Sequence, residues 1–397
     1  MAIEIPSYVS DLMKTLLNSR HECFVVGGAV RSALLCAEVH DYDLTTDALP
    51  GEMKEIFSSY RTIETGIRHG TLTVLSEGKP VEITTYRKDS TYSDHRHPDQ
   101  VEFTSRLQED CARRDFTVNA LCADIDGNLY DFFEGRRDLQ QKLIRCIGSA
   151  DERFDEDALR ILRALRFAAR LGFQIEKKTS DALRRKKDLL LYISAERIRD
   201  ELTGFLNASG CAELFEDYFE VFEVIIPELK QLNEEEKKQL YSQLKRSEND
   251  YILRLALIVS MTGYSEEIMK SLKMTNHEIR DINNLLSLSE RPLDTLSDIC
   301  RIKKDLKQDF KRYALFRYAL DEKTDVGQMM NLNRMIIENG DCYSLKDLAV
   351  KGNDLKELGF CGKEISERLN QLLEDVIDSK LANEKEVLLD SLRYTKQ

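Results

Sequence analysis

The chain has 397 residues, of which 42% are apolar and 32% charged, and its net charge is −13. These values predict a globular protein of two to four domains, and no apolar run approaches the length of a membrane-spanning helix. The N-terminal segment MAIEIPSYVSDLMKTLL carries acidic residues where a signal peptide has a basic start, so we expect a cytoplasmic protein. Nine cysteines without a CxxC pair favour neither a disulfide framework nor a structural zinc site, and we expect buried, reduced thiols.

Charge is uneven along the chain. Residues 151–200 hold 13 Lys and Arg against 10 Asp and Glu, a local excess of +3 in an acidic protein. Such a strip can bind a phosphate backbone, although a solvated helical face has the same composition.

Residues 1 to about 145 mix helical segments with short strand-like runs bounded by Gly, Asp or Asn, which predicts an α/β or α+β domain. The runs are CFVVGGAV, HDYDLTT, GTLTVL, KPVEITTYR and ALCADIDGNLYDF. From about residue 150, apolar residues recur at helical spacing and strand-like alternation disappears, so we expect the remainder to be almost wholly helical.

The stretch FVVGGAVRSALL joins a predicted strand to a predicted helix through Gly27 and Gly28. Because glycines lack Cβ atoms, backbone N–H groups can approach a ligand there, and the helix directs its positive end to the same place. With Arg31 on the first turn, this stretch predicts a phosphate cradle. A tight turn without a ligand is the alternative.

Asp41 and Asp43 follow in HDYDLTT. In a strand, residues i and i+2 share a face, so we expect these carboxylates about 6 to 7 Å apart. Like charges so placed repel each other unless a divalent cation lies between them. The glycine turn, the helix and the DxD pair together predict a site for a Mg²⁺-bound triphosphate, with a pair of solvated acids as the alternative for DxD alone.

GGAVR followed by DYDLTTDA resembles the signature of the polymerase-β-type nucleotidyltransferase superfamily, in the version of class II tRNA nucleotidyltransferases (CCA-adding enzymes) and bacterial poly(A) polymerases. Where that family usually has Asp, this chain has Ser32, which leaves the metal ligands intact and alters the contact that the Asp makes. Six further blocks resemble successive family motifs in their usual order: TGIRHGTLTV (65–74), VEITTYR (81–87), RRDFTVNAL (113–121), DFFEGRRDL (131–139), RFDEDALRILRALRFAARLGF (153–173) and ISAERIRDEL (193–202). The segment 348–378 is similar to the tail of bacterial CCA-adding enzymes.

The resemblance implies an α+β fold. A polymerase-β-type nucleotidyltransferase head with a small mixed sheet of five strands is followed by all-helical neck, body and tail domains. The implied ranges are 1–145 for the catalytic head, 146–205 for the neck, 206–300 for the body and 301–397 for a tRNA-binding tail.

Transfer of a nucleotide from a triphosphate to a 3′-hydroxyl requires metal ions and acidic ligands. We expect Asp41 and Asp43 to be catalytic and to hold two Mg²⁺ ions. Glu82 is a further candidate ligand, for which an ordinary exposed strand residue is the alternative. The resemblance implies that Arg113, Arg114 and Asp115 surround the ribose and phosphates, and we expect at least one of these charges in a structural salt bridge.

The block EDALR bears on nucleotide choice. On a helix, Glu156, Asp157 and Arg160 fall within a sector of roughly 100°, opposite an apolar face. A carboxylate beside a guanidinium can accept a hydrogen bond from an exocyclic amine and donate one to the adjacent ring nitrogen, an order that cytosine and adenine share and that uracil and guanine reverse. The resemblance implies that Asp157 and Arg160 pair with the incoming base and that Glu156 supports Arg160, whereas a solvated salt bridge is the alternative.

The segment RKDSTYSDHRHPDQ, residues 87–100, is polar and lacks periodicity, which predicts a mobile loop. It resembles the flexible loop that CCA-adding and A-adding enzymes have and that CC-adding enzymes lack. Its candidate functional residues are Arg87, Asp89, Tyr92, Asp94 and Arg96. An ordinary surface loop is the alternative.

For tRNA, we expect the arginine stripe Arg160, Arg163, Arg166 and Arg170 to follow the acceptor-stem backbone. Arg163 and Arg166 could instead be buried in salt bridges at a domain junction. Lys363, at the start of a tail helix, is expected to contact a phosphate on the distal part of the tRNA, with an ordinary helix cap as the alternative. Neither a membrane nor an obligatory protein partner is implied.

These features predict a template-independent, Mg²⁺-dependent tRNA nucleotidyltransferase that adds C, C and A from CTP and ATP. A bacterial poly(A) polymerase is an alternative that the acidic helical half disfavours. An A-adding enzyme with a separate CC-adding partner is compatible with the same motifs. A non-catalytic RNA-binding protein is disfavoured because both Asp41 and Asp43 are present.

Overall fold

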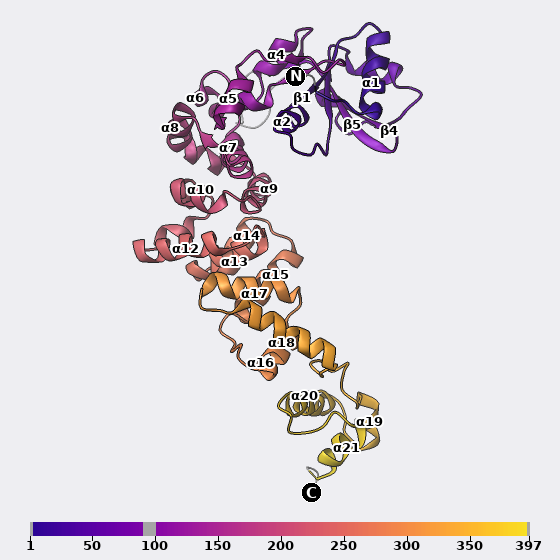
Figure 1. Ribbon diagram of the computed structural model, residues 1–397, viewed down its shortest axis with the longest axis vertical. Coiled ribbons are helices and arrows are strands. Elements are labelled where there is room, and N and C mark those ends of the chain that lie inside the picture. The colour runs from indigo at the N-terminus through magenta and orange to yellow at the C-terminus, as the bar shows by residue number, and fades with distance from the viewer. Residues whose placement is uncertain (1–2, 90–100, 395–397) are drawn as a thin grey trace. The chain divides into compact units, whose positions relative to one another are not determined.

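The computed structural model describes residues 3–89 and 101–394. The chain forms two compact units, Met1–Lys230 and Gln231–Gln397, which are considered one at a time (Figure 1). The proposed division into head, neck, body and tail at residues 145, 205 and 300 stays a prediction.

The first unit contains a sheet with the strand order β3-β4-β5-β2-β1-β8-β9. Strand β2 is parallel to β5, and the other neighbours in this sheet are antiparallel, so the mixed sheet is confirmed. The strands are β1 (Cys23–Val26), β2 (Asp43–Thr46), β3 (Arg61–Ile63), β4 (Thr71–Ser76), β5 (Lys79–Thr85), β8 (Cys122–Ala123) and β9 (Leu129–Tyr130).

The expectation of five strands is wrong, because this sheet has seven. Strand β3 is added at one edge, where it pairs with β4. The run ALCADIDGNLYDF forms two strands instead of one, since the chain reverses at Gly127, whose φ of 78° suits a residue without a side chain.

Two small sheets also differ from the expectation. Strand β6 (Arg87–Asp89) pairs with β7 (Val101–Phe103). The first three residues of the predicted loop 87–100 therefore form a strand. Strand β10 (Leu143–Ile144) pairs in parallel with β11 (Gln174–Ile175), which places a short strand in the part expected to be helical.

The helices of the first unit follow the apolar spacing of the sequence. Helix α7 buries one apolar face and packs against α9, and it ends at Gly172, which has the left-handed conformation that favours glycine. The α-helices are α1 (Ser7–Asn18), α2 (Gly28–Leu34), α3 (Pro50–Ile56), α4 (Leu107–Ala112), α5 (Gly135–Gln141), α6 (Ala150–Glu156), α7 (Leu159–Leu171), α8 (Lys177–Lys186), α9 (Ala195–Leu206), α10 (Cys211–Asp217) and α11 (Phe219–Ile225). Short 3₁₀-helices are η1 (Ile67–His69), η2 (Thr117–Asn119), η3 (Lys187–Tyr192) and η4 (Pro227–Gln231).

Among its described residues the second unit has helices joined by loops and no strand, as expected. Side chains of Asn233, Thr275 and Thr295 accept hydrogen bonds from the first turns of their helices, which satisfies N–H groups that a helix end leaves unpaired. Its helices are α12 (Glu234–Arg246), α13 (Tyr251–Thr262), α14 (Ser265–Ser271), α15 (Asn276–Ser287), α16 (Leu296–Asp305), α17 (Phe310–Leu320), α18 (Val326–Asn339), α19 (Gly352–Glu357), α20 (Lys363–Ile377) and α21 (Lys385–Tyr394).

Across residues 3–89 and 101–394, no helix has both the length and the apolar character needed to cross a membrane.

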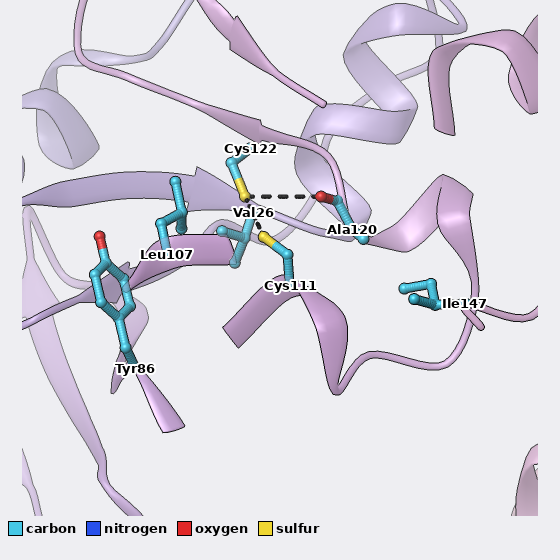
Figure 2. Packing of buried hydrophobic residues seen from close by; sticks show 7 residues of the cluster. All are labelled: Val26, Tyr86, Leu107, Cys111, Ala120, Cys122 and Ile147. Atoms are coloured by element: carbon cyan, nitrogen blue, oxygen red, sulfur yellow. Dashed lines mark hydrogen bonds between the residues drawn. The ribbon is translucent and has the colours of Figure 1, made fainter. Parts of the chain in front are cut away.

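One buried cluster joins the sheet of the first unit to α4. It contains Val26, Tyr86, Leu107, Cys111, Ala120, Cys122 and Ile147 (Figure 2). Figure 2 shows the thiols of Cys111 and Cys122 directed toward each other, with their sulfur atoms 3.2 Å apart. The hydrogen bond from Cys111 and burial raise the pKa of the Cys122 thiol, so it is protonated at neutral pH.

Seven of the nine cysteines are buried and all are unpaired by disulfides. The expectation that all would be buried is wrong for Cys36 and Cys361, which are exposed. Cys36 lies in the turn after α2, and Cys361 precedes α20.

Candidate nucleotide site

A cavity of about 470 Å³ in the first unit brings together most of the predicted nucleotide-binding residues. Asp41, Glu82 and Glu156 are not among the residues that line it. The lining residues are Gly27, Gly28, Arg31, Asp43, Arg87, Arg113, Arg114, Asp115, Asn119, Asp157, Arg160, Arg163 and Phe167.

The glycine turn forms one wall of this cavity. Strand β1 ends at Val26, and α2 begins at Gly28. Gly27 has a φ of 67°, and a Cβ atom there would lie 3.4 Å from an Nη atom of Arg114. Position 27 therefore favours glycine for its backbone conformation, whereas a Cβ would meet Arg114 only at an ordinary contact distance.

Asp43 is the first residue of β2, and the strand register places it beside two functional elements. Its neighbours are Val26, which directly precedes the glycine turn, and Glu82 on β5. Asp41 lies before β2 rather than inside it, so the expected geometry of two residues in one strand is wrong. Its carboxylate still acts electrostatically on Asp43.

The carboxylates fit a divalent cation by their charge. Asp43 is accessible to solvent, but the surrounding protein removes part of its water, and this desolvation followed by repulsion from Glu82 raises its pKa. Asp41 adds to the shift and Arg114 opposes it. A bound cation would relieve this repulsion, although within the described residues no three His, Cys, Asp or Glu side chains gather into a ready-made metal site.

Asp110, which was not among the predicted residues, links several parts of the cavity wall. Its side chain is 0% exposed, and it accepts hydrogen bonds from Arg113 Nε at 2.8 Å and an Arg114 Nη at 3.2 Å. It also accepts from the Thr45 hydroxyl on β2 at 3.2 Å and the backbone N–H of Arg87 at 3.3 Å. Burial would raise the pKa of Asp110, but the two arginines and the N–H outweigh it and lower the pKa.

Asp115 is held in the same way by neighbours inside the cavity. One oxygen accepts from the Phe116 N–H at 2.8 Å and the Asn119 amide at 2.9 Å, while the other accepts from Arg163 at 2.7 and 2.9 Å. Each residue of the RRD block therefore forms a structural salt bridge with a residue outside the block. The pairs are Arg113–Asp110, Arg114–Asp110 and Asp115–Arg163.

The EDALR block lies across a helix break, which corrects the expectation of one continuous helix. Helix α6 ends at Glu156, Asp157 is extended with φ −142° and ψ 102°, and α7 begins at Leu159. Asp157 pairs with Arg197 on α9 at 2.8 Å and accepts from the Leu159 N–H at 3.1 Å.

Arg160 is fixed by three acceptors. It pairs with Glu156 and donates to the backbone oxygens of Arg153 at 3.1 Å and Arg113 at 3.2 Å. Glu156 thus lies behind Arg160, while Asp157 and Arg160 line the same cavity. This arrangement agrees with a supporting position for Glu156, whose role stays a prediction.

The arginine stripe of α7 is engaged inside the unit. Arg163 pairs with Asp115 and with Glu201 at 3.5 Å, and Arg166 pairs with Glu201 at 2.5 Å. Arg170 is exposed. The salt-bridge alternative therefore describes the geometry of Arg163 and Arg166, and the contact of all three arginines with tRNA stays a prediction.

The remaining predicted residues fall in other places. Arg87 lines the cavity and donates to the His69 carbonyl at 2.7 Å, and Asp89 is the last residue of β6. Tyr92, Asp94 and Arg96 lie outside the described residues. In the second unit, Lys363 is exposed on the first turn of α20.

Three functional candidates were missed by reasoning from sequence: Asp110, Asn119 and Phe167. Asp110 precedes Arg113 and Arg114 by three and four residues, a helical spacing that favours ion pairs. Asn119 lies in the quoted block RRDFTVNAL without an assigned role, and Phe167 is typical of an apolar helix face.

Comparison with known proteins identifies the family. Residues 23–145 match the Poly A polymerase head domain, residues 172–232 the RNA and SrmB-binding site of polymerase A, and residues 242–392 the tRNA nucleotidyltransferase domain 2. The chain is 34% identical to the CCA-adding enzyme of Lactobacillus gasseri, over 98% of this chain and 97% of that protein. It is 31% identical to the CCA-adding enzyme of Bacillus subtilis, over 96% of each.

A solved structure gives the same result. The Bacillus stearothermophilus CCA-adding enzyme, crystallised in complex with CTP, is 28% identical and superposes with a TM-score of 0.85, covering 99% of both chains. The chain therefore belongs to the family of CCA-adding enzymes.

Proposed function

We propose that the chain is a template-independent tRNA nucleotidyltransferase, which adds C, C and A to the 3′ end of tRNA from CTP and ATP. The observation that carries this proposal is a single cavity that contains the glycine turn, Asp43 and the pair Asp157 and Arg160. Six arginines and three aspartates line it, an excess of positive charge that suits a triphosphate. The relative of known structure binds CTP, which supports a cytidine nucleotide as one substrate.

The head residues act on the phosphates. The Gly27–Gly28 turn presents backbone near Arg31 and Arg114, so N–H groups and guanidiniums can bind the triphosphate together. Asp41 and Asp43 would hold Mg²⁺, with Glu82 beside Asp43 as a further ligand. Such ions, when bound, polarise the α-phosphate and lower the pKa of the attacking 3′-hydroxyl.

The neck residues act on the base. Asp157 accepts hydrogen bonds and Arg160 donates them, and both are fixed by partners outside the cavity centre. An exocyclic amine can donate to Asp157 while the adjacent ring nitrogen accepts from Arg160. Cytosine and adenine satisfy both groups, whereas uracil and guanine leave a donor facing a donor and an acceptor facing an acceptor.

RNA is the proposed acceptor substrate. The family matches at residues 172–232 and 242–392 support RNA binding beyond the catalytic head. Arg163, Arg166, Arg170 and Lys363 are the proposed tRNA-contacting residues. CTP, ATP and tRNA occur together in the cytoplasm, which is the compartment we propose for the reaction.

The test is to incubate the purified protein with Mg²⁺, CTP, ATP and a tRNA transcript that lacks its last three nucleotides, and to sequence the products. The expected 3′ ends are CCA with no further addition. Addition of A only to a transcript that already ends in CC would identify an A-adding enzyme. Long A tails would identify a poly(A) polymerase, and unchanged transcripts of both kinds would refute catalysis.

A further inference from the structure

Phe167 is an unusual member of the cavity wall because three guanidiniums surround its ring. The ring lies on α7 and is 7% exposed. The guanidinium carbons of Arg31, Arg163 and Arg166 lie 5.1, 5.2 and 4.5 Å from its centroid. Phe116 packs edge-on against it, with centroids 5.9 Å apart.

Two of these three charges are neutralised by carboxylates. Arg163 pairs with Asp115 and Glu201, and Arg166 pairs with Glu201. Among the residues that the structure describes, no carboxylate forms an ion pair with Arg31, which bonds to the neutral amide of Asn119. Its Nε has no partner there either. Among these three arginines, Arg31 is therefore the one with which no carboxylate of the described residues forms an ion pair, although the charge of Asp115 acts on it from a distance.

Arg31 remains charged in spite of this environment. Its side chain is 7% exposed, and burial, followed by repulsion from Arg170, Arg166 and Arg163, lowers its pKa to about 10, while the charge of Asp115 opposes the shift. At neutral pH the guanidinium is thus protonated and directed into a cavity that holds more arginines than aspartates. A buried cation without a direct ion pair is stabilised when an anionic group binds to it.

The Phe167 ring can attract Arg31 without neutralising its charge, whereas a carboxylate at this position would neutralise it. The face of an aromatic ring attracts cations through its quadrupole without cancelling their charge. Phe167 can therefore hold Arg31 close to two other arginines and leave its charge available to a ligand. A leucine of similar size would fill the space without this attraction.

We infer that Phe167 is a positioning residue whose ring holds Arg31 in place to receive a phosphate group of the incoming nucleotide. This inference rests on the proposed function. Arg31 lies on the first turn of α2 after the glycine turn, and it shares the cavity with Asp43, so the nucleotide is favoured over the RNA backbone as the source of the phosphate.

The experiment compares Phe167→Leu and Phe167→Tyr with a matched control, Phe222→Leu. Phe222 is also buried in the first unit, but it packs on Phe205 and Phe215 and does not line the cavity. The affinities for CTP, CDP and CMP are measured by calorimetry with Mg²⁺ present. Steady-state KM and kcat are measured for CTP, ATP and the shortened tRNA.

Phe167→Leu is expected to weaken CTP binding about tenfold, as the loss of one cation–π contact would. CMP binding should change less than about twofold, because CMP keeps the α-phosphate but lacks the β- and γ-phosphates, to which we assign the contact of Arg31. KM for CTP and ATP should rise together, while kcat and the preference for C and A over U and G stay within about twofold of the parent enzyme. Phe167→Tyr should restore CTP binding because it keeps the ring face, and Phe222→Leu should lower the melting temperature without changing the CTP-to-CMP affinity ratio.

Equal loss of CTP and CMP affinity in Phe167→Leu would mean a merely structural role and would overturn the inference. So would unchanged CTP binding, or a rise confined to the KM for tRNA, which would assign Arg31 to the RNA backbone. If Phe167→Leu does not fold, Phe167→Met, which keeps volume without a π face, gives the same comparison. Failure of the parent enzyme to extend any transcript would refute the proposed function, while a CTP-to-CMP ratio that depends on Phe167 would still support this inference.

Discussion

The cavity has two walls whose charges are arranged differently. The head wall contains Asp43 in the predicted head, and the neck wall contains Asp157, Arg160 and Arg163 in the predicted neck. On the head wall, Asp43 faces Glu82 and Asp41, and within the described part of the chain no cation pairs with it directly. On the neck wall, the charged groups already have opposite partners: Glu156 pairs with Arg160, Asp157 with Arg197, and Arg163 with Asp115 of the head. We therefore propose that the head wall binds a cation, whereas the charges of the neck wall are already paired within the protein.

This difference suggests separate roles for the two walls: the head wall in the chemical step, and the neck wall in the choice of nucleotide. A divalent cation relieves the repulsion between neighbouring carboxylates, so we expect these carboxylates to act in the chemical step through a bound metal ion. Ion-paired side chains keep one orientation in the absence of a base, and a base whose donors and acceptors are reversed leaves buried groups unsatisfied. Substitutions on the head wall should thus abolish the rate, and substitutions on the neck wall should change the choice of nucleotide.

The largest effect is expected from Asp43→Asn. The amide is similar in size but cannot hold a divalent cation as a carboxylate does, and loss of several kcal/mol of charge stabilisation reduces kcat by about a thousandfold or more. Single-turnover incorporation of CMP into the shortened tRNA measures this loss. Asp41→Ala should act in the same direction.

The matched control is Asp126→Asn, an exposed aspartate of the first unit outside the cavity. It should leave kcat unchanged, and all three variants should bind tRNA as the parent does in a gel-shift measurement. Full activity in Asp43→Asn would remove the metal assignment from the head wall.

A second effect, smaller in rate, should appear on the neck wall. Asp157→Ala removes the acceptor for the exocyclic amine and leaves Arg197 without its partner. A bidentate contact to a base edge contributes about 1 to 3 kcal/mol to discrimination, so the preference for CTP and ATP over UTP and GTP should fall about 10- to 100-fold. Competition among the four nucleotides, followed by sequencing of the products, measures the preference.

Asp155→Ala is the control for this change. Asp155 lies on α6, two residues before Asp157, and pairs with Lys186 outside the cavity. It should retain the parent preference. If Asp155→Ala and Asp157→Ala change the preference equally, the base is selected elsewhere.

A third substitution tests the role of Asp110, the buried carboxylate that pairs with Arg113 and Arg114 of the cavity wall. Asp110→Asn removes the charge that holds Arg113 and Arg114, both of which line the cavity. We expect kcat/KM for CTP and ATP to fall about tenfold, mostly through KM, because loss of a charge-assisted hydrogen bond costs about 1.5 to 3 kcal/mol. The ratio of CTP to UTP incorporation should stay unchanged, since Asp157 and Arg160 keep their partners.

Asp138→Asn provides a control of the same kind. Asp138 is buried, binds Arg145 at 3.0 Å and the Thr117 hydroxyl at 2.6 Å, and does not line the cavity. Both variants should lose stability, but only Asp110→Asn should raise KM. An equal change of KM in the two would show that Asp110 acts through stability alone.

How far the sequence predicts this site depends on whether the partners are local. The glycine turn, β1 and β2 follow from runs of adjacent residues, and they lie as expected apart from Asp41. That residue falls outside the strand on the β1 side, because β1 ends at Val26, which pairs with Asp43, and the glycine turn follows. Where a strand ends depends on the length of the strand that it pairs with, and the sequence of the strand alone does not contain this information.

Partners distant in sequence explain most of the other differences. The helix break at Asp157 is accompanied by a bond to Arg197, forty residues later, which the local EDALR pattern does not contain. Phe167 has the spacing of a core residue, and its contacts with Arg31 arise only when α2 and α7 meet at the cavity. Asp110 is the exception, because its spacing to Arg113 and Arg114 was visible from the start.

The smallest expected effect is on the pH dependence of folding stability, and it differs in sign between Asp43 and Asp115. Because the pKa of Asp43 is raised in the folded state, its charged form is less favourable there than in the unfolded chain, and stability falls as pH rises through this raised pKa. The sign is opposite for Asp115, whose pKa is lowered in spite of burial, chiefly by Arg163, so its contribution is present above about pH 4 and is lost in acid. Asp43→Asn should therefore raise Tm slightly at pH 7 and have no effect below about pH 4, where the carboxyl is protonated in both states.

Thermal unfolding at pH 7 with and without Mg²⁺ completes this comparison. A cation that binds only the folded state raises Tm by mass action, so Mg²⁺ should stabilise the parent and Asp126→Asn but not Asp43→Asn. Asp115→Asn should be destabilised at pH 7 because Arg163 and Asn119 lose an anionic partner, yet it should keep its response to Mg²⁺. A lower Tm for Asp43→Asn than for the parent at pH 7 without Mg²⁺ would mean that the head-wall carboxylate is already compensated, and the contrast between the two walls would not hold.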